Sequence, residues 1–219
     1  MKKLLLAGIA SLLSLTAQAA PITADTVLTQ GNLTFMNFSC TDNTVGGGAG
    51  GACSGLSVNT FGETGIQIAG GLSAFTGPGG TASTQDILVS YKIHASGTPF
   101  STIGLGFNGD FEANSFAEVS EAVFADADRT QLLDRGLVRV SALSSTVFDT
   151  LTFTPVFFAY VVKDILLQSF PPGGLATISS VTQVHNSVPV PEPASLAILG
   201  MGLLGLGVAR KLSARNKAA

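Results

Sequence analysis

The chain has 219 residues, of which 46% are hydrophobic and only 11% are charged. Residues 20–190 contain five Lys and Arg against thirteen Asp and Glu, a net charge of −8 that the whole-chain value of −3 conceals. Because an acidic surface repels phosphate, this composition argues against a nucleic-acid-binding protein. The length suits one domain with shorter segments on either side.

Residues 1–19 have the three parts of a secretory signal peptide. Two lysines precede an apolar run at 4–15, and the small residues Ala17, Ala19 and Ala20 follow. Twelve apolar residues are too few to span a bilayer comfortably, which favours a cleaved leader over an anchor. We expect signal peptidase to cut after Ala19 and the remainder to be exported.

Cys40 and Cys53 would then lie in an oxidising compartment. The segment between them is rich in glycine, which lets its two ends approach, and we expect a disulfide. Two cysteines without a nearby histidine pair make a poor zinc site, so no metal or cofactor is predicted.

Residues 20–187 are predicted to form one all-β domain, an antiparallel β-sandwich of jelly-roll-like type. Segment 87–95 alternates cleanly, with apolar residues on one face and Ser90, Lys92 and His94 on the other. Segment 116–126 mixes the helix formers Ala and Glu with Val, and we favour a strand there. Other strands are predicted at 33–39, 103–107, 137–143, 150–167 with a break at Pro155, and 176–186.

Half of the acidic residues lie in one short part of this domain, and we expect most of them to form a solvated acidic edge. They are Asp110, Glu112, Glu118, Glu121, Asp126, Asp128 and Asp134. Asp126, Asp128 and Thr130 copy the first three alternating ligands of a calcium loop, but Gln131 replaces the required Gly and Leu137 the required Glu. They are a weak calcium candidate.

Sequence signals for catalysis are poor. Hydrolysis of a glycosidic bond needs two facing carboxylates, and the spacing of the acids does not predict such a pair. His94 and His185 have no partner at metal-ligand or triad spacing, and both are expected on strand surfaces. We therefore predict a non-enzymatic protein, with a secreted hydrolase as the third alternative.

Carbohydrate binding is the second hypothesis for the function, ranked after the non-enzymatic role and before the hydrolase, because exported sandwiches often bind sugars. Sugar rings stack on exposed aromatic faces. Trp is absent here, Tyr occurs only as Tyr91 and Tyr160, and the fourteen Phe are expected mainly in the core. The sequence alone offers no clear aromatic platform.

The segment after the domain is predicted to be a membrane anchor. Residues 188–193 form a proline-spaced linker, 194–211 a transmembrane helix and 212–219 a basic cytoplasmic tail. Sixteen uncharged helical residues reach about 24 Å, short of a bilayer core of about 30 Å. Arg210 and Lys211 extend the span by snorkelling, and all four cations after the span hold the tail in the cytoplasm. These cations are Arg210, Lys211, Arg215 and Lys217.

Pro191-Glu192-Pro193, followed by an apolar glycine-containing span and a short Arg/Lys cluster, resembles a PEP-CTERM sorting signal. The resemblance implies a Gram-negative bacterial protein that an exosortase recognises at Pro191, Glu192 and Pro193. It further implies an inner-membrane-anchored precursor with a periplasmic domain, which is then sorted to the cell surface or extracellular matrix, often in organisms that make exopolysaccharide. The domain itself resembles an ectodomain type that recurs ahead of such tails, and no activity is attached to that type. The resemblance lies at 31–38, 86–92, 116–121, 162–167 and 178–183.

Overall fold

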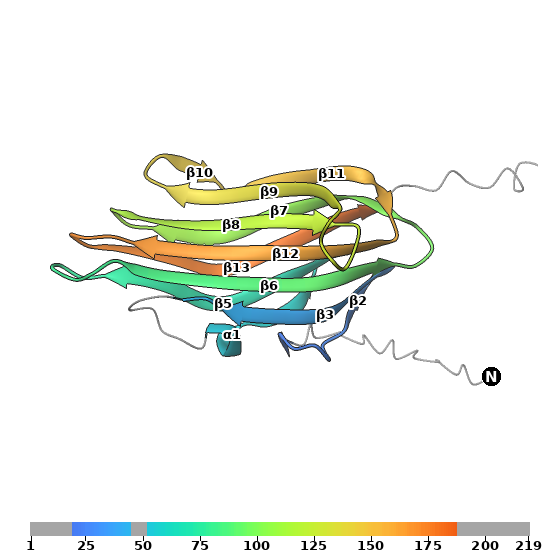
Figure 1. Cartoon of the computed structure of the whole chain (residues 1–219), viewed down its shortest axis with the longest axis horizontal. Coiled ribbons are helices and arrows are strands. Elements are labelled where there is room, and N and C mark those ends of the chain that lie inside the picture. The colour runs from blue at the N-terminus through green and yellow to red at the C-terminus, as the bar shows by residue number, and fades with distance from the viewer. Residues whose placement is uncertain (1–18, 45–51, 188–219) are drawn as a thin grey trace, which may run out of the picture. The chain divides into compact units, whose positions relative to one another are not determined.

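The computed structural model describes residues 19–44 and 52–187 (Figure 1). The predicted signal segment up to residue 18, the glycine-rich loop at 45–51 and the predicted linker, membrane helix and basic tail at 188–219 lie outside the described residues. In the part of the chain that is described, no helix has the length and apolar character needed to cross a membrane.

The described residues form two antiparallel sheets packed face to face, which confirms the predicted β-sandwich. The six-stranded sheet contains, in spatial order, β1 (Ala20–Pro21), β4 (Ser57–Phe61), β5 (Gly65–Thr76), β13 (Gly174–Ser187), β7 (Phe100–Phe111) and β11 (Phe148–Val156). The seven-stranded sheet contains β10 (Ser144–Thr146), β9 (Leu132–Ser141), β8 (Ser115–Phe124), β12 (Phe158–Ser169), β6 (Ser83–Ala95), β3 (Leu33–Asp42) and β2 (Leu28–Gln30).

Eight of these strands follow the jelly-roll order. Strands β5, β13, β7 and β11 lie side by side in one sheet, and β6, β12, β8 and β9 in the other. The chain crosses from one sheet to the other between successive strands β5, β6, β7 and β8, and again between β11, β12 and β13. This is the double Greek-key topology of a jelly roll.

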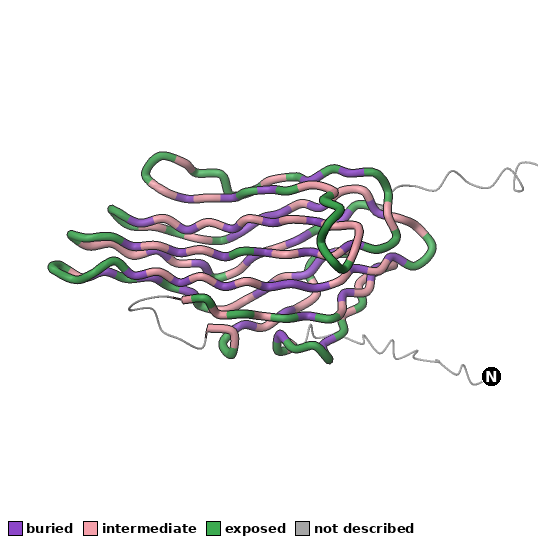
Figure 2. The backbone as a smooth tube through the Cα atoms, viewed as in Figure 1, coloured by how far each residue is buried: buried purple, intermediate pink, exposed green. Residues whose placement is uncertain are grey.

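Alternation of side chains builds the core. Along β8 and β12 every second residue is buried, and Figure 2 shows the same alternation along the neighbouring strands. The inward faces meet in one apolar core whose largest members include Phe35, Phe38 and Phe100. Each such side chain stabilises the fold by about 1.5–3 kcal/mol through removal of apolar surface from water.

Segment 116–126, in which helix formers compete with β-branched residues, is strand β8 as far as Phe124, so the strand prediction is confirmed. The predicted break at Pro155 lies slightly later: β11 continues to Val156, and Phe157 separates it from β12. Pro155 is tolerated because β11 is an edge strand and its pairing with β7 is irregular between Thr152 and Val156.

A disulfide joins the only two cysteines. Cys40 lies on β3 and Cys53 on the short helix α1 (Ala52–Gly55), with their Cα atoms 5.8 Å apart. A carboxylate oxygen of Asp42 also accepts a hydrogen bond from the backbone N–H of Ala52 at 3.1 Å. Both contacts tie α1 to the end of β3.

Candidate functional site

Polar side chains from both sheets meet inside the core, and we call Glu121, Lys163, Gln183 and His185 the core cluster. Glu121 on β8 and Lys163 on β12 are direct cross-strand partners and point inward. Gln183 and His185 lie on β13 of the opposite sheet. All four are at most 1% exposed.

Glu121 is at the centre of the hydrogen bonding in this cluster. The Lys163 Nζ contacts its Oε2, and the Gln183 Nε2 donates to its Oε1 at 2.7 Å. Burial lowers the pKa of Lys163 from 10.5 to about 7, because the charged ammonium loses its hydration. The Gln183 Oε1 is buried and has no hydrogen-bond partner among the described residues.

His185 is held as a neutral ring. Its Nδ1 donates to the Thr64 carbonyl oxygen at 2.9 Å, which leaves Nε2 as a bare acceptor, and that atom is buried without a partner in the described part of the chain. The ring packs against Phe35 and Phe100, with centroids 5.2 and 5.6 Å away. Burial lowers the pKa of His185 from 6.5 to about 3, and the nearby charge of Lys163 acts in the same direction.

Two expectations are therefore wrong. Glu121 was expected on a solvated acidic edge and His185 on a strand surface, whereas both are in the core. In both cases strand alternation decides the direction: Glu121 occupies an inward position between Val119 and Val123, and His185 faces inward on β13.

The outer face of the seven-stranded sheet carries a groove of about 510 Å³. Its floor is formed by the small residues Ser120 and Ala122 of β8, and larger side chains of the two adjacent strands, β9 and β12, stand on either side. These neighbours are Arg135 and Leu137 of β9 and Val162 and Asp164 of β12. Small residues in the middle of a sheet with longer ones beside them create the hollow.

Asp164 gives the groove a carboxyl group that is a weaker acid than usual, because its pKa is raised. Partial burial raises its pKa, and a shared hydrogen bond and charge repulsion with Asp86, together with repulsion from Glu118, raise it further. Glu118 also forms an ion pair with Arg139 at 3.2 Å. The groove therefore offers carboxyl oxygens as hydrogen-bond acceptors beside apolar walls.

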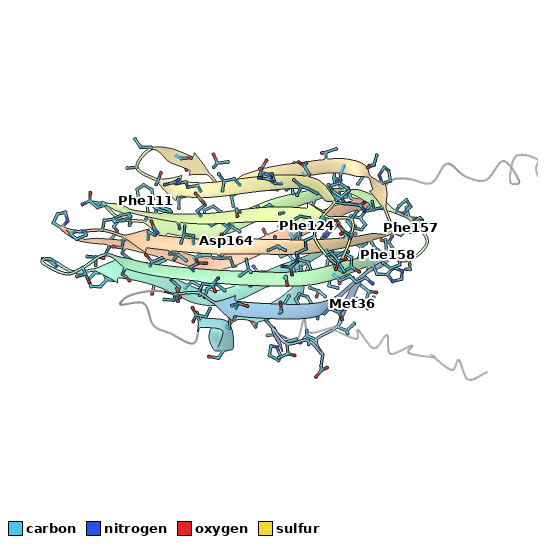
Figure 3. All side chains as sticks on the ribbon, viewed as in Figure 1. Met36, Phe111, Phe124, Phe157, Phe158 and Asp164 are labelled. Atoms are coloured by element: carbon cyan, nitrogen blue, oxygen red, sulfur yellow. A yellow bond between two sulfur atoms is a disulfide. The ribbon has the colours of Figure 1, made fainter. Side chains whose placement is uncertain are left out.

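Aromatic side chains gather on the same face near one end of the sheet. Phe158 is 46% exposed and stacks on His94 with ring centroids 4.6 Å apart. The Lys92 ammonium lies 4.7 Å from the centre of the Phe158 ring and 5.7 Å from that of Tyr160. Phe124 is the cross-strand neighbour of Tyr160. Figure 3 labels Phe124, Phe158 and Asp164 along this face.

Phenylalanine is consequently less confined to the core than expected. Only five of the fourteen are buried, and six are exposed. The expectation was wrong because several Phe occur at strand ends and turns, where alternation no longer directs a side chain inward. The exposed ones are Phe61, Phe75, Phe148, Phe157, Phe158 and Phe170.

The loop between β8 and β9 folds over this end of the face (Figure 1). Asp126 organises the loop, since its carboxylate accepts hydrogen bonds from Thr130 Oγ1 at 2.8 Å and from the Gln131 backbone N–H at 2.8 Å. These bonds lower the pKa of Asp126. Arg129 reaches back to Ser90 Oγ at 3.1 Å.

The acids predicted from sequence do not converge on one point. Asp126 binds its own loop, Glu121 is inside the core, and Asp134 accepts from the Thr152 backbone N–H at 2.7 Å. Asp128 is exposed in the same loop as Asp126. Within residues 19–44 and 52–187, no group of three or more His, Cys, Asp or Glu side chains is placed to hold a metal ion.

The fold and the tail together define a jelly-roll domain that carries a sorting signal. A family model described as the PEP-CTERM protein-sorting motif matches residues 189–211, which include Pro191, Glu192 and Pro193. The motif implies an exported protein, made through a membrane-anchored precursor and processed by an exosortase. No curated protein matches the chain.

Several solved structures are distantly similar. One is TmCBM61 in complex with beta-1,4-galactotriose, at 9% identity over 68% of this chain and 88% of that chain, with a TM-score of 0.34. Another is the xyloglucanase domain of NopAA from Sinorhizobium fredii, at 9% identity over 80% and 99% of the chains and a TM-score of 0.27. Likeness at this level supports no statement about ligands.

Proposed function

We propose that this protein is a non-enzymatic structural or interaction protein of the bacterial cell envelope or extracellular matrix, delivered there by its sorting tail. The observation that carries the proposal is the match of the sorting motif to residues 189–211. In this proposal the tail anchors the precursor in the inner membrane, the jelly-roll domain faces the periplasm, and an exosortase cuts near Pro191, Glu192 and Pro193. The cations that follow the apolar span hold it in place until then.

The test compares three forms of the full chain in a Gram-negative host that encodes an exosortase. The natural chain should appear in a shortened form at the surface or in the medium. A chain lacking residues 191–219 should be released without anchoring. A chain with Pro191, Glu192 and Pro193 all changed to Ala should stay in the membrane at full length. Membrane retention of the truncated chain would contradict the proposal.

Binding of an extracellular polysaccharide is the second candidate function. The outer groove favours it, because it sets the carboxyl group of Asp164 beside the apolar side chains of Leu137 and Val162. Phe158 is exposed on the same face of β12, six residues or about 20 Å along the strand from Asp164. Aromatic faces pack against the CH groups of sugar rings while carboxylates accept their hydroxyl hydrogens. A chain molecule of several sugar units would be long enough to contact both the groove and the exposed rings on this face.

Affinity electrophoresis through polysaccharide gels tests this candidate. The gel should retard the natural protein. Phe158→Ala and Asp164→Ala should each be retarded less, which corresponds to an apparent affinity lower by about tenfold, or about 1.4 kcal/mol. Phe75→Ala is the matched control, since Phe75 is 64% exposed but belongs to the six-stranded sheet. Equal mobility of the natural protein in gels with and without each of several polymers would remove the candidate.

A further inference from the structure

The core cluster contains an amine and a carboxyl group in direct contact and out of reach of water. The Lys163 side chain is 1% exposed and that of Glu121 is 0% exposed. They are register partners on adjacent antiparallel strands, so the backbone holds the two Cβ atoms close together. The Lys163 Nζ contacts the Glu121 Oε2.

An ion pair at this position is an expensive way to fill a core. Two charges lose their hydration, and their mutual attraction rarely offsets that loss unless every remaining donor and acceptor is also bonded. Here the cluster is incompletely bonded, because Gln183 Oε1 and His185 Nε2 have no partner among the described residues. Glu121 and Lys163 are also the only fully buried side chains of the Asp, Glu, Lys and Arg types in the described part of the chain.

We propose that Lys163 and Glu121 become joined by an intramolecular isopeptide bond, an amide between Nζ and Cδ. A covalent link here would join β12 to β8 in the middle of the seven-stranded sheet. It would also replace two buried charges with one neutral amide.

The reaction is a condensation without any redox change. A proton moves from the Lys163 ammonium to the Glu121 carboxylate, which gives a neutral amine and a neutral acid. The Nζ lone pair attacks Cδ, the bond from Cδ to Oε2 breaks, and Oε2 leaves as water with the acid proton and one proton from Nζ. The new amide keeps Oε1 as its carbonyl oxygen and one N–H. Burial supports the first step, because it lowers the pKa of Lys163 to about 7 and so makes the neutral, nucleophilic amine accessible.

The surrounding side chains suit both the reaction and its product. Gln183 Nε2 donates to Oε1 at 2.7 Å, on the oxygen that gains negative charge when Nζ attacks. Gln183 Oε1, a buried acceptor without a partner, is available for the N–H that the new amide carries. In this role Gln183 acts directly on a reacting atom, since it stabilises the charge that develops on Oε1, and the carboxyl carbon of Glu121 is the electrophile.

Mass spectrometry of the exported protein tests the proposal. The full chain is expressed with its leader and tail, and the mature form is purified, reduced and denatured, with its termini determined so that the sequence mass is known. We expect a mass lower than the sequence mass by one water molecule. After trypsin digestion we expect no cleavage after Lys163 and a branched peptide that joins residues 93–129 to a peptide beginning at residue 140.

Two substitutions serve as comparison. Lys163→Arg keeps a cation but removes the nucleophilic amine, so its mass should equal its sequence mass. Lys92→Arg, on the outer face, should still lose one water molecule. Lys163→Arg places a larger cation in the core and can prevent folding. The branched peptide of the natural protein is therefore the decisive readout. An unlinked Lys163 in folded natural protein would overturn the proposal, and so would loss of ammonia with a link from Lys163 to Gln183, which would appear as a loop within the one peptide that begins at residue 140.

Discussion

The burial of His185 makes the stability of this domain depend on pH in a way that one substitution can isolate. The folded state keeps the ring neutral, since burial lowers its pKa to about 3, whereas an unfolded chain protonates it below 6.5. Between these two values the unfolded state binds one more proton than the folded state. Acid therefore favours unfolding, and stability rises with pH across this window.

The size of the effect follows from the pKa difference. Each pH unit inside the window changes the free energy of unfolding by about 1.4 kcal/mol. On going from pH 7 to pH 4 the loss from His185 alone is about 3 kcal/mol, and the whole window corresponds to about 5 kcal/mol. That is comparable with the total stability of many domains, about 5–15 kcal/mol.

Urea unfolding followed by far-ultraviolet circular dichroism is the appropriate assay, because the chain has no Trp and only two Tyr. In His185→Asn the amide can replace the donor to the Thr64 carbonyl but has no group that protonates at mild acidity. We expect the natural protein to lose about 3 kcal/mol more than this variant between pH 7 and pH 4. His94→Asn, on the outer face, should behave like the natural protein.

Parallel pH profiles of the natural protein and His185→Asn would refute the reasoning, because carboxylate contributions are common to both and cancel in the difference. The natural protein supplies an independent check by NMR. The ring signals of His185 should not titrate above about pH 4, and this check holds even if a variant fails to fold.

Three further predictions concern the scaffold. In Gly65→Ala the new Cβ would lie 2.2 Å from a backbone carbonyl oxygen of β13, so we expect a loss of about 3 kcal/mol in unfolding free energy by urea titration. Replacing Cys40 and Cys53 with Ser should cost about 3 kcal/mol in the same assay, because the disulfide closes a loop with a sequence separation of 13 residues. Asp126→Ala should accelerate hydrogen exchange in the β8–β9 loop, whereas EDTA should leave the melting temperature of the natural protein unchanged.

Each of these has its own control. Gly71→Ala lies on the same strand with nothing within 4 Å of the new Cβ, so a loss as large as that of Gly65→Ala would disprove the steric account. Reduction of the natural protein should reproduce the effect of the cysteine substitutions. A melting temperature that falls on addition of EDTA and recovers with Ca²⁺ would restore the calcium hypothesis for Asp126.

Much of this architecture could be predicted from the sequence because its signals are local. Alternation of apolar residues fixes which face of a strand is buried, which is why segment 87–95 was assigned to a strand. Segment 116–126 was assigned to a strand partly on its resemblance to a recurrent ectodomain, because its Ala and Glu residues favour a helix while its Val residues favour a strand. The order of proline motif, apolar span and cations likewise needs no tertiary information, because the sorting motif is one contiguous segment, matched at residues 189–211.

The core cluster and the outer groove depended on tertiary structure. Glu121 was expected on a solvated edge and nothing was predicted for Lys163, whereas the structure directs both side chains into the core. Only the pairing of β8 with β12 made them neighbours, and only the opposite sheet brought Gln183 and His185 to them. The groove similarly required Ser120 and Ala122 to stand between longer side chains of adjacent strands. The face of a strand on which a side chain lies follows from the alternation of its neighbours along the chain. Which strands pair is set by packing between distant segments, and that pairing decides which side chains meet in the core cluster and the outer groove.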